Sequence, residues 1–79
     1  MAASRYTLTA MVENRFGVLA RVAILISRRG FNIERLSVGP AEAEGVARMT
    51  MVLDGELADR QRLAAQLNKL IDVLAVEVD

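Results

Sequence analysis

Residues 5–29 have the sequence RYTLTAMVENRFGVLARVAILISRR, and this stretch decides the fold. In its first nine residues, apolar side chains stand at every second position: Tyr6, Leu8, Ala10 and Val12. This period of two predicts a half-buried β-strand over residues 5–13. From Gly17 to Arg29 the apolar residues instead repeat at helical spacing, which predicts an amphipathic helix. The chain therefore begins with a strand that leads through Asn-Arg-Phe-Gly into a helix.

A second strand is predicted over residues 31–38, after Gly30, which suits the left-handed position that often follows a helix. The apolar alternation of this strand slips by one position after Ile33. We expect either a β-bulge near Glu34-Arg35 or burial of both faces of the strand. Gly39-Pro40 is expected to end the strand, because proline cannot donate to a ladder of hydrogen bonds.

The rest of the chain predicts a third strand over residues 46–53, a second helix over residues 58–70 and a fourth strand over residues 71–78. Asp54-Gly55 is expected to turn the chain after the third strand. Right-handed crossovers then place both helices on one face of a four-stranded antiparallel sheet, with the first and third strands in the centre. The predicted fold class is the α+β ferredoxin-like βαββαβ sandwich.

The composition limits what the protein can do. A chain of 79 residues that is 53% hydrophobic predicts one domain, residues 1–79 with a core of about 5–78. Ten basic and ten acidic residues give no net charge, which removes the electrostatic case for binding nucleic acid or an acidic membrane. A sequence without Cys or His excludes disulfides, thiolate or imidazole metal sites and Ser-His-Asp triads. The longest apolar run, residues 22–26, is too short to span a membrane, so we expect a soluble, cytoplasmic protein.

The turn between the first strand and the first helix is the candidate binding site. A helix N-terminus offers unpaired N–H groups and a partial positive charge, to which a carboxylate binds readily. Gly17 lets a ligand approach the backbone, and the Asn14 amide offers both a donor and an acceptor. The alternative is that Asn14 only caps the helix or shapes the turn, while Gly17 relieves strain. Asn32 presents a similar choice between a local backbone hydrogen bond and the ammonium group of a ligand across an interface.

The second strand is expected to lie at an edge of the sheet with apolar residues along it. Such an edge invites pairing with another chain, and a domain of this size has a thin stability margin of its own. We therefore expect a homodimer joined edge to edge, which forms one eight-stranded sheet. The alternative is a monomer whose edge is shielded by twist. The predicted interface residues are Ile33, Leu36 and Val38 of the strand and Ile24 of the first helix.

The sequence lacks residues that other functions of this fold require. RNA recognition needs aromatic side chains on the central strands, and the stretch 46–53 has none. A small acylphosphatase-like hydrolase stays open as an alternative, because Asn14 and Arg15 lie in the loop where such an enzyme cradles its anion. That loop has a single Gly and no run of converging donors, so a binding or regulatory module is favoured.

Two stretches resemble a known family. Residues 12–22, VENRFGVLARV, resemble the first motif of ACT domains, which are small modules that bind amino acids and regulate metabolic enzymes. Residues 27–40, SRRGFNIERLSVGP, closely resemble the corresponding stretch in the small, regulatory subunits of acetolactate synthase (acetohydroxyacid synthase). Residues 47–50 and 68–73 match later motifs of that family, so the resemblance extends over almost all of the chain. The second stretch, with Gly-aromatic-Asn-Ile-Glu and a Pro after the strand, is the more specific one.

The resemblance implies a regulatory subunit with no catalytic residues. The large subunit would carry thiamine diphosphate, Mg²⁺ and the carboligation chemistry, and this chain would hold no cofactor or metal. The chain would raise the activity of the large subunit and confer feedback inhibition by valine, or by leucine or isoleucine. Many members have a second, C-terminal domain, so this sequence is expected to be either a short-form subunit or a fragment. The alternative is a stand-alone ACT-domain amino-acid sensor that regulates another enzyme.

The resemblance also implies where the effector binds, at the interface of an ACT dimer. The implied effector-binding residues are Asn14, Gly17, Val18 and Leu19 from one protomer and Asn32 and Ile33 from the other, with Gly39 beside the site. The large subunit is expected to contact the helix-free face of the sheet, which includes Met11, Arg48 and Thr50.

Overall fold

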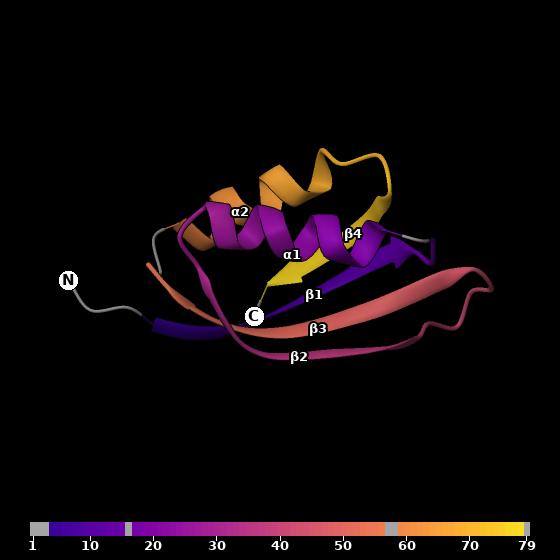
Figure 1. Ribbon diagram of the computed structural model, residues 1–79, viewed down its shortest axis with the longest axis horizontal. Helices are drawn as coiled ribbons and strands as arrows, with labels where there is room; N and C mark the ends of the chain where they lie inside the picture. Colours follow the sequence, from indigo (N-terminus) through magenta and orange to yellow (C-terminus); the bar gives the residue numbers. More distant parts are fainter. Residues whose placement is uncertain (1–3, 16, 57–58, 79) are drawn as a thin grey trace.

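A computed structural model describes residues 4–15, 17–56 and 59–78 of the chain (Figure 1). The elements in chain order are β1 (Ser4–Glu13), α1 (Val18–Arg28), β2 (Asn32–Pro40), β3 (Val46–Gly55), α2 (Arg60–Asn68) and β4 (Val73–Val78). The strands form one sheet in the order β2-β3-β1-β4, with antiparallel neighbours throughout. Both helices lie on the same face of this sheet. The predicted ferredoxin-like fold, with the first and third strands in the centre, is confirmed.

The core lies between the two central strands and the two helices. Alternate residues of β1 are buried beside alternate residues of β3, with Leu8 opposite Met51 and Ala10 opposite Met49 in the strand register. The helices add buried side chains from one face each: Val18, Val22 and Ile26 from α1 and Leu63, Ala64 and Leu67 from α2. The period of two in β1 is therefore confirmed. Burying a side chain such as Leu or Met contributes roughly 1.5–3 kcal/mol.

The end of α1 sets the path of the chain into the sheet. Gly30 has a φ of +89°, as predicted for the left-handed residue after the helix. Its N–H donates to the Ser27 carbonyl at 3.1 Å, and the Phe31 N–H donates to the Ile26 carbonyl at 3.3 Å. This pair of bonds is the Schellman arrangement, which satisfies the last carbonyls of the helix. It reverses the chain so that Phe31 is buried in the core and β2 begins at Asn32.

A β-bulge is present in β2, as one of the two predicted alternatives. The register with β3 shifts between Ile33 and Arg35. After the shift, Leu36 and Val38 lie opposite two buried methionines of β3, so both share the helix-bearing side of the sheet with Ile33. They are nevertheless 50% and 45% exposed, because β2 is the outermost strand on its side.

Two predicted strand ends were wrong. β2 does not stop before Gly39-Pro40 but continues through both residues, which lie opposite Arg48 and Ala47 of β3. Proline is tolerated there because the outer side of an edge strand needs no donor within the sheet. Asp54-Gly55 does not turn the chain either, since both residues pair with the start of β1. In both places pairing with a neighbouring strand outweighs the local preference for a turn.

The second helix and the last strand are shorter than predicted. α2 ends at Asn68, and the half-buried Leu70 lies beyond it. The predicted start of this helix at Ala58 lies outside the described residues. β4 begins at Val73, whose N–H donates to the Leu70 carbonyl in a turn, whereas Ile71 is 90% exposed. Over the residues described, neither helix has the length and apolarity needed to cross a membrane.

Gly55 lies against a buried aromatic pair. A Cβ placed on Gly55 would stand 2.9 Å from Cε2 of Phe31 and closer still to Cδ2. The Phe31 ring packs edge-on against Tyr6, with ring centroids 6.2 Å apart and planes at 86°. Burial of Tyr6 also raises the pKa of its phenol. An added methyl would therefore have to displace the Phe31 ring from its contact with Tyr6.

The substitution Gly55→Ala should lower the free energy of unfolding by about 1–3 kcal/mol, because the added methyl overpacks the Phe31 ring. Urea denaturation of the two proteins measures the difference. Gly39→Ala is the matched control, since it is also a strand glycine but has open space around the added Cβ. The control should change stability by less than about 0.5 kcal/mol. Equal stability of Gly55→Ala and the parent protein would contradict the packing argument.

Candidate functional site

A shallow hollow of about 590 Å³ lies at the turn between β1 and α1. Its lining residues are Asn14, Arg15, Gly17, Leu19 and Ala20. Three of the predicted binding residues, Asn14, Gly17 and Leu19, are therefore brought together by the structure. The hollow combines the backbone of the turn with the apolar side chains of Leu19 and Ala20. This combination suits a small ligand that has a polar group and an apolar group.

The turn leaves the start of α1 without a side-chain cap. Gly17 occupies the N-cap position with φ +88° and ψ −16°, and no side chain caps the helix there. The Asn14 backbone N–H donates to the Gly45 carbonyl at 2.9 Å, while the Asn14 side chain has no hydrogen bond within the described part of the chain. Asn14 is therefore not the helix cap. A positive φ is the conformation that glycine accepts best, so Gly17 does relieve strain in this turn.

Val18 lies beside the hollow but faces the core. Its side chain is only 2% exposed, and its N–H donates to the Arg15 carbonyl at 3.2 Å. The side chain of Val18 is therefore not accessible to a ligand in this structure, and only its backbone borders the turn.

The remaining predicted binding residues lie at opposite ends of β2. Gly39 pairs with Arg48, close to where Val46 pairs with Glu13 at the end of β1. Asn32 and Ile33 pair with the far end of β3, next to the start of β1. The Asn32 amide lies 3.4 Å from the Glu34 carboxylate, which accepts a hydrogen bond from it. Within one chain, Gly39 therefore lies at the same end of the sheet as the turn, and Asn32 and Ile33 do not.

Exposed apolar side chains occur on α1 and on β2. Ile24 is exposed on α1, and with Leu25 and Leu70 it lines a small hollow of about 230 Å³ between two arginines, Arg21 and Arg28. Leu36 and Val38 are exposed on β2. Three of the four predicted interface residues are thus exposed, and the fourth, Ile33, is half-buried against the core.

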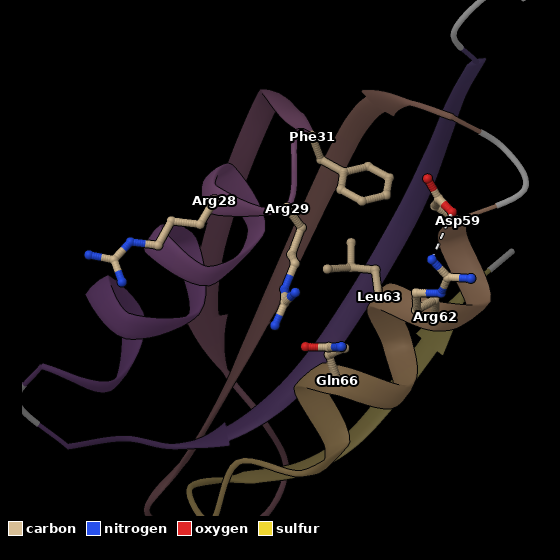
Figure 2. A pocket seen from close by; sticks show the side chains of 7 residues that line it. All are labelled: Arg28, Arg29, Phe31, Asp59, Arg62, Leu63 and Gln66. Carbon is tan, nitrogen blue, oxygen red and sulfur yellow. Dashed lines mark ion pairs between the residues drawn. The ribbon is translucent and has the colours of Figure 1, made fainter.

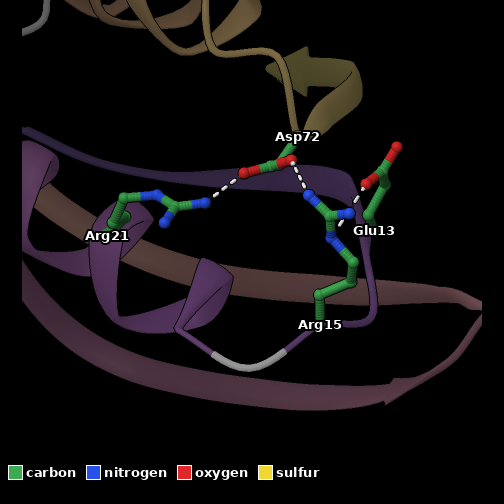
Figure 3. A network of polar contacts seen from close by, with 4 residues as sticks. All are labelled: Glu13, Arg15, Arg21 and Asp72. Carbon is green, nitrogen blue, oxygen red and sulfur yellow. Dashed lines mark hydrogen bonds and ion pairs between the residues drawn. The ribbon is translucent and has the colours of Figure 1, made fainter.

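A network of four charged residues supports the turn (Figure 3). The Asp72 carboxylate accepts a hydrogen bond from Arg15, with Nη2 3.1 Å from Oδ1, and another from Arg21. Arg15 also forms an ion pair with Glu13 at 3.3 Å. The Glu13 backbone N–H donates to the main-chain carbonyl of Asp72 at 2.9 Å. The connection between α2 and β4 is in this way fastened to the end of β1, the turn and α1.

Sequence reasoning missed this network. Asp72 is 57 residues from Arg15 and 51 residues from Arg21 along the chain, so no local pattern joins them. They come together because β4 pairs with β1, which places the start of β4 beside the end of β1.

A protein-family model, the AHAS small subunit-like ACT domain, matches residues 8–75 of the chain. The chain belongs to this family. The match includes the turn, the whole of α1 and β2, and Asp72.

Relatives of known name agree with this assignment. The acetolactate synthase small subunit of Mycobacterium avium is 49% identical over 76 residues, which are 96% of this chain and 46% of that protein. A probable acetolactate synthase small subunit of Methanothermobacter thermautotrophicus is 47% identical over 96% of this chain and 45% of its own length. The crystal structure of the acetolactate synthase small subunit from Thermotoga maritima superposes with a TM-score of 0.86 at 32% identity, over 95% of this chain and 47% of that one. The chain spans less than half the length of these relatives.

The network argues against the alternative that this ACT domain is a small acylphosphatase-like hydrolase. The Arg15 guanidinium forms ion pairs with two carboxylates, those of Glu13 and Asp72. Its charge is therefore already balanced and is not held ready for a phosphate. Across the described residues, no group of three or more acidic side chains lies where it would hold a metal ion.

A third hollow of this ACT domain, about 300 Å³, lies between the end of α1 and the start of α2 (Figure 2). It is lined by Arg28, Arg29, Phe31, Asp59, Arg62, Leu63 and Gln66. Arg29 extends toward Gln66, Arg28 points away, and Arg62 lies 3.8 Å from Asp59. None of the predicted binding residues lies here. The hollow is at the opposite end of α1 from the turn and carries three guanidinium groups against one carboxylate.

Proposed function

We propose that this chain is the regulatory ACT domain of an acetolactate synthase and that it binds valine, or a related branched-chain amino acid, between two copies of itself. The proposal is supported by membership of the small-subunit family. The observation that carries it is the uncapped start of α1, which opens at Gly17 beside a hollow lined by Leu19 and Ala20. Such a site offers a place for a carboxylate and a place for an aliphatic side chain.

In this proposal each group of the amino acid has its own counterpart at the turn. The carboxylate lies against the N–H groups at the start of α1, where the helix dipole is positive. The ammonium group is held by the amide oxygen of Asn14, which makes no hydrogen bond of its own in the described part of the chain. The aliphatic side chain packs on Leu19. One chain leaves this hollow shallow, so a second surface is needed to enclose the ligand.

A dimer joined along β2 supplies that surface. If two copies of β2 pair antiparallel about Leu36, with Glu34 as the unpaired residue of the bulge, Ile33 of the second copy lies opposite Val38 of the first, and Asn32 lies opposite Gly39. Gly39 is at the same end of the sheet as the turn. The pairing therefore carries Asn32 and Ile33 from the far end of their own sheet to the turn of the other copy. The bulge in β2 places Leu36 and Val38 on the helix-bearing side, where Leu36 meets Leu36 of the other copy and Val38 meets Ile33.

Regulation requires the ligand to distinguish two states of the holoenzyme. A ligand shared by two chains stabilises the dimer by about 2.7 kcal/mol when it is in hundredfold excess over its dissociation constant. It changes catalysis only if it binds one conformation of the assembly more tightly than another. In the proposed function the large subunit carries thiamine diphosphate and Mg²⁺, and this chain raises its activity and makes it sensitive to the amino acid.

The helix-free face of the sheet is the surface that we assign to the large subunit. Met11 lies opposite Arg48, and Thr9 lies opposite Thr50, on the face away from both helices. With Ala75 and Glu77 of β4, Thr9, Met11 and Arg48 border a hollow of about 430 Å³. The dimer along β2 leaves this face open, so the two partners do not compete.

The chain should sediment as a dimer of twice 8.6 kDa at micromolar concentration. Leu36→Glu should give a monomer, because two carboxylates then face each other across the paired strands. The side chain of Leu36 is half exposed, so the variant should keep its fold. Ile71→Glu is the control, since Ile71 is also apolar, is more exposed than Leu36 and lies away from β2. A monomeric parent chain would end the model of a site between two copies.

Gly17→Asp should weaken valine binding at least tenfold, because it places a like charge where the ligand carboxylate lies. Gly17→Asn is the matched control: it has the same size, accepts a positive φ about as well, and carries no charge. Calorimetric titration of both variants with valine gives the comparison. The charge argument would be rejected by equal affinities of the Asp and Asn variants.

Reconstitution with the cognate large subunit tests the regulatory role. Addition of this chain should increase the rate of acetolactate formation, and valine should then reduce it. Absence of both effects, in a chain that still binds an amino acid, would favour a stand-alone ACT-domain sensor that acts on another enzyme. Co-purification with a thiamine-dependent large subunit separates the same two alternatives.

A further inference from the structure

The Asp72 carboxylate is the point at which the turn is held to the rest of the domain. Its side chain is 13% exposed, whereas the two arginine side chains that bind it, Arg15 and Arg21, are 66% and 58% exposed. Figure 3 shows the two guanidinium groups reaching Asp72 from opposite sides. Arg15 belongs to the turn itself, and Arg21 lies one helical turn into α1. One carboxylate thus fixes both ends of the segment that forms the hollow.

We propose that Asp72 is a positioning residue for the effector: it holds the turn between β1 and α1 in the shape that binds an amino acid, without touching the ligand itself. This inference rests on the proposed amino-acid site at that turn. Asp72 is not among the residues that line the hollow, and Arg15 is. The effect of Asp72 on a ligand is therefore transmitted through Arg15 and Arg21.

The turn has few other ties to the domain. Its described backbone bonds are Asn14 N–H to the Gly45 carbonyl, Arg15 N–H to the Glu13 carbonyl, Val18 N–H to the Arg15 carbonyl and Arg21 N–H to the Gly17 carbonyl. Two of these four stay within the turn or join it to the last residue of β1, and the fourth joins it to α1. Among the described residues no side chain caps the start of α1, and Gly17 in the middle of the segment adds conformational freedom in the unbound state. A turn with these properties depends on its arginine–carboxylate contacts for a fixed shape.

The same contacts matter little to the fold as a whole. Ion pairs made by exposed arginines contribute little to global stability. The core that holds β1 in place extends well beyond the neighbourhood of Asp72, to side chains such as Leu8 and Met51. Loss of the Asp72 charge should therefore loosen the turn and leave the domain folded. This separation between binding and stability distinguishes a positioning role from a merely structural one.

Asp72→Asn tests the inference, because it removes the charge and keeps the size. Valine titration should give an affinity about 3- to 10-fold weaker than that of the parent chain, with little change in the midpoint of thermal unfolding. Asp59→Asn is the matched control, since it removes a carboxylate that faces Arg62 at the other end of the helix pair. The control should leave the affinity unchanged. In the background Arg15→Gln/Arg21→Gln, Asp72→Asn should cause no further loss.

Hydrogen exchange provides a measurement that does not depend on the ligand. The amides of Asn14, Arg15 and Val18 should exchange several-fold faster in Asp72→Asn, and those of Gly30 and Phe31 at the other end of α1 should not. If the parent chain binds no valine while these three amides respond, the proposed function fails and the holding role of Asp72 stands. If the parent binds valine, equal affinity or unchanged exchange in Asp72→Asn would overturn the inference. Asp72→Glu keeps the charge, so its valine affinity and its amide exchange rates should lie between those of the parent chain and those of Asp72→Asn. It replaces Asp72→Asn in the test if that variant does not fold.

Discussion

The pairing of β1 between β3 and β4 is the constraint on which the rest of the structure depends. One face of β1 is fully buried, from Tyr6 to Val12, so a shift of one residue would expose the whole set and bury Thr7 and Thr9 instead. The register is therefore fixed, and with it the point at which β1 ends. Because Glu13 is held there by the Asp72 carbonyl, the turn that follows is always formed at the same place on the domain.

The two outer strands of this sheet, β4 and β2, differ in how their apolar side chains are covered. β4 packs against α2 and buries Val73, and its partly buried Val76 and Val78 pack against the core. β2 has a partner on one side only, and its bulge moves Leu36 and Val38 to the helix-bearing side, where they remain half exposed. Without the bulge these two side chains would lie on the open face. One extra residue in β2 thus decides that the apolar surface available to a second copy lies along this edge.

The accuracy of the sequence predictions depended on how local their physical causes are. The period of β1, the glycine after α1 and the slip in β2 are signals within a few residues, and the structure confirms them. The ends of β2 and β3 were missed because pairing with a neighbour keeps Pro40 and Gly55 in strands that their own preferences would end. Asn14, Gly17 and Leu19 of the candidate site could be predicted together because they lie in one turn, and the structure places them around one hollow. Asp72 was not found, because only the three-dimensional arrangement brings it to that turn.

The charges around the hollows at the two ends of α1 bear on the proposal that the turn binds an amino acid. At the turn, the guanidinium groups of Arg15 and Arg21 are balanced by the carboxylates of Glu13 and Asp72, so the network has no net charge. The positive potential that remains comes from the dipole of α1. It attracts a carboxylate at the start of the helix and does not favour a net anion over the whole site. A zwitterion meets both conditions, since its carboxylate is attracted and its total charge is zero. The hollow at the other end of α1 has an excess of arginines, and there a net anion would be favoured instead. Under the proposed function, the ion pairs of Asp72 would serve selectivity as well as shape, because they balance the positive charge that would otherwise attract any anion to the turn.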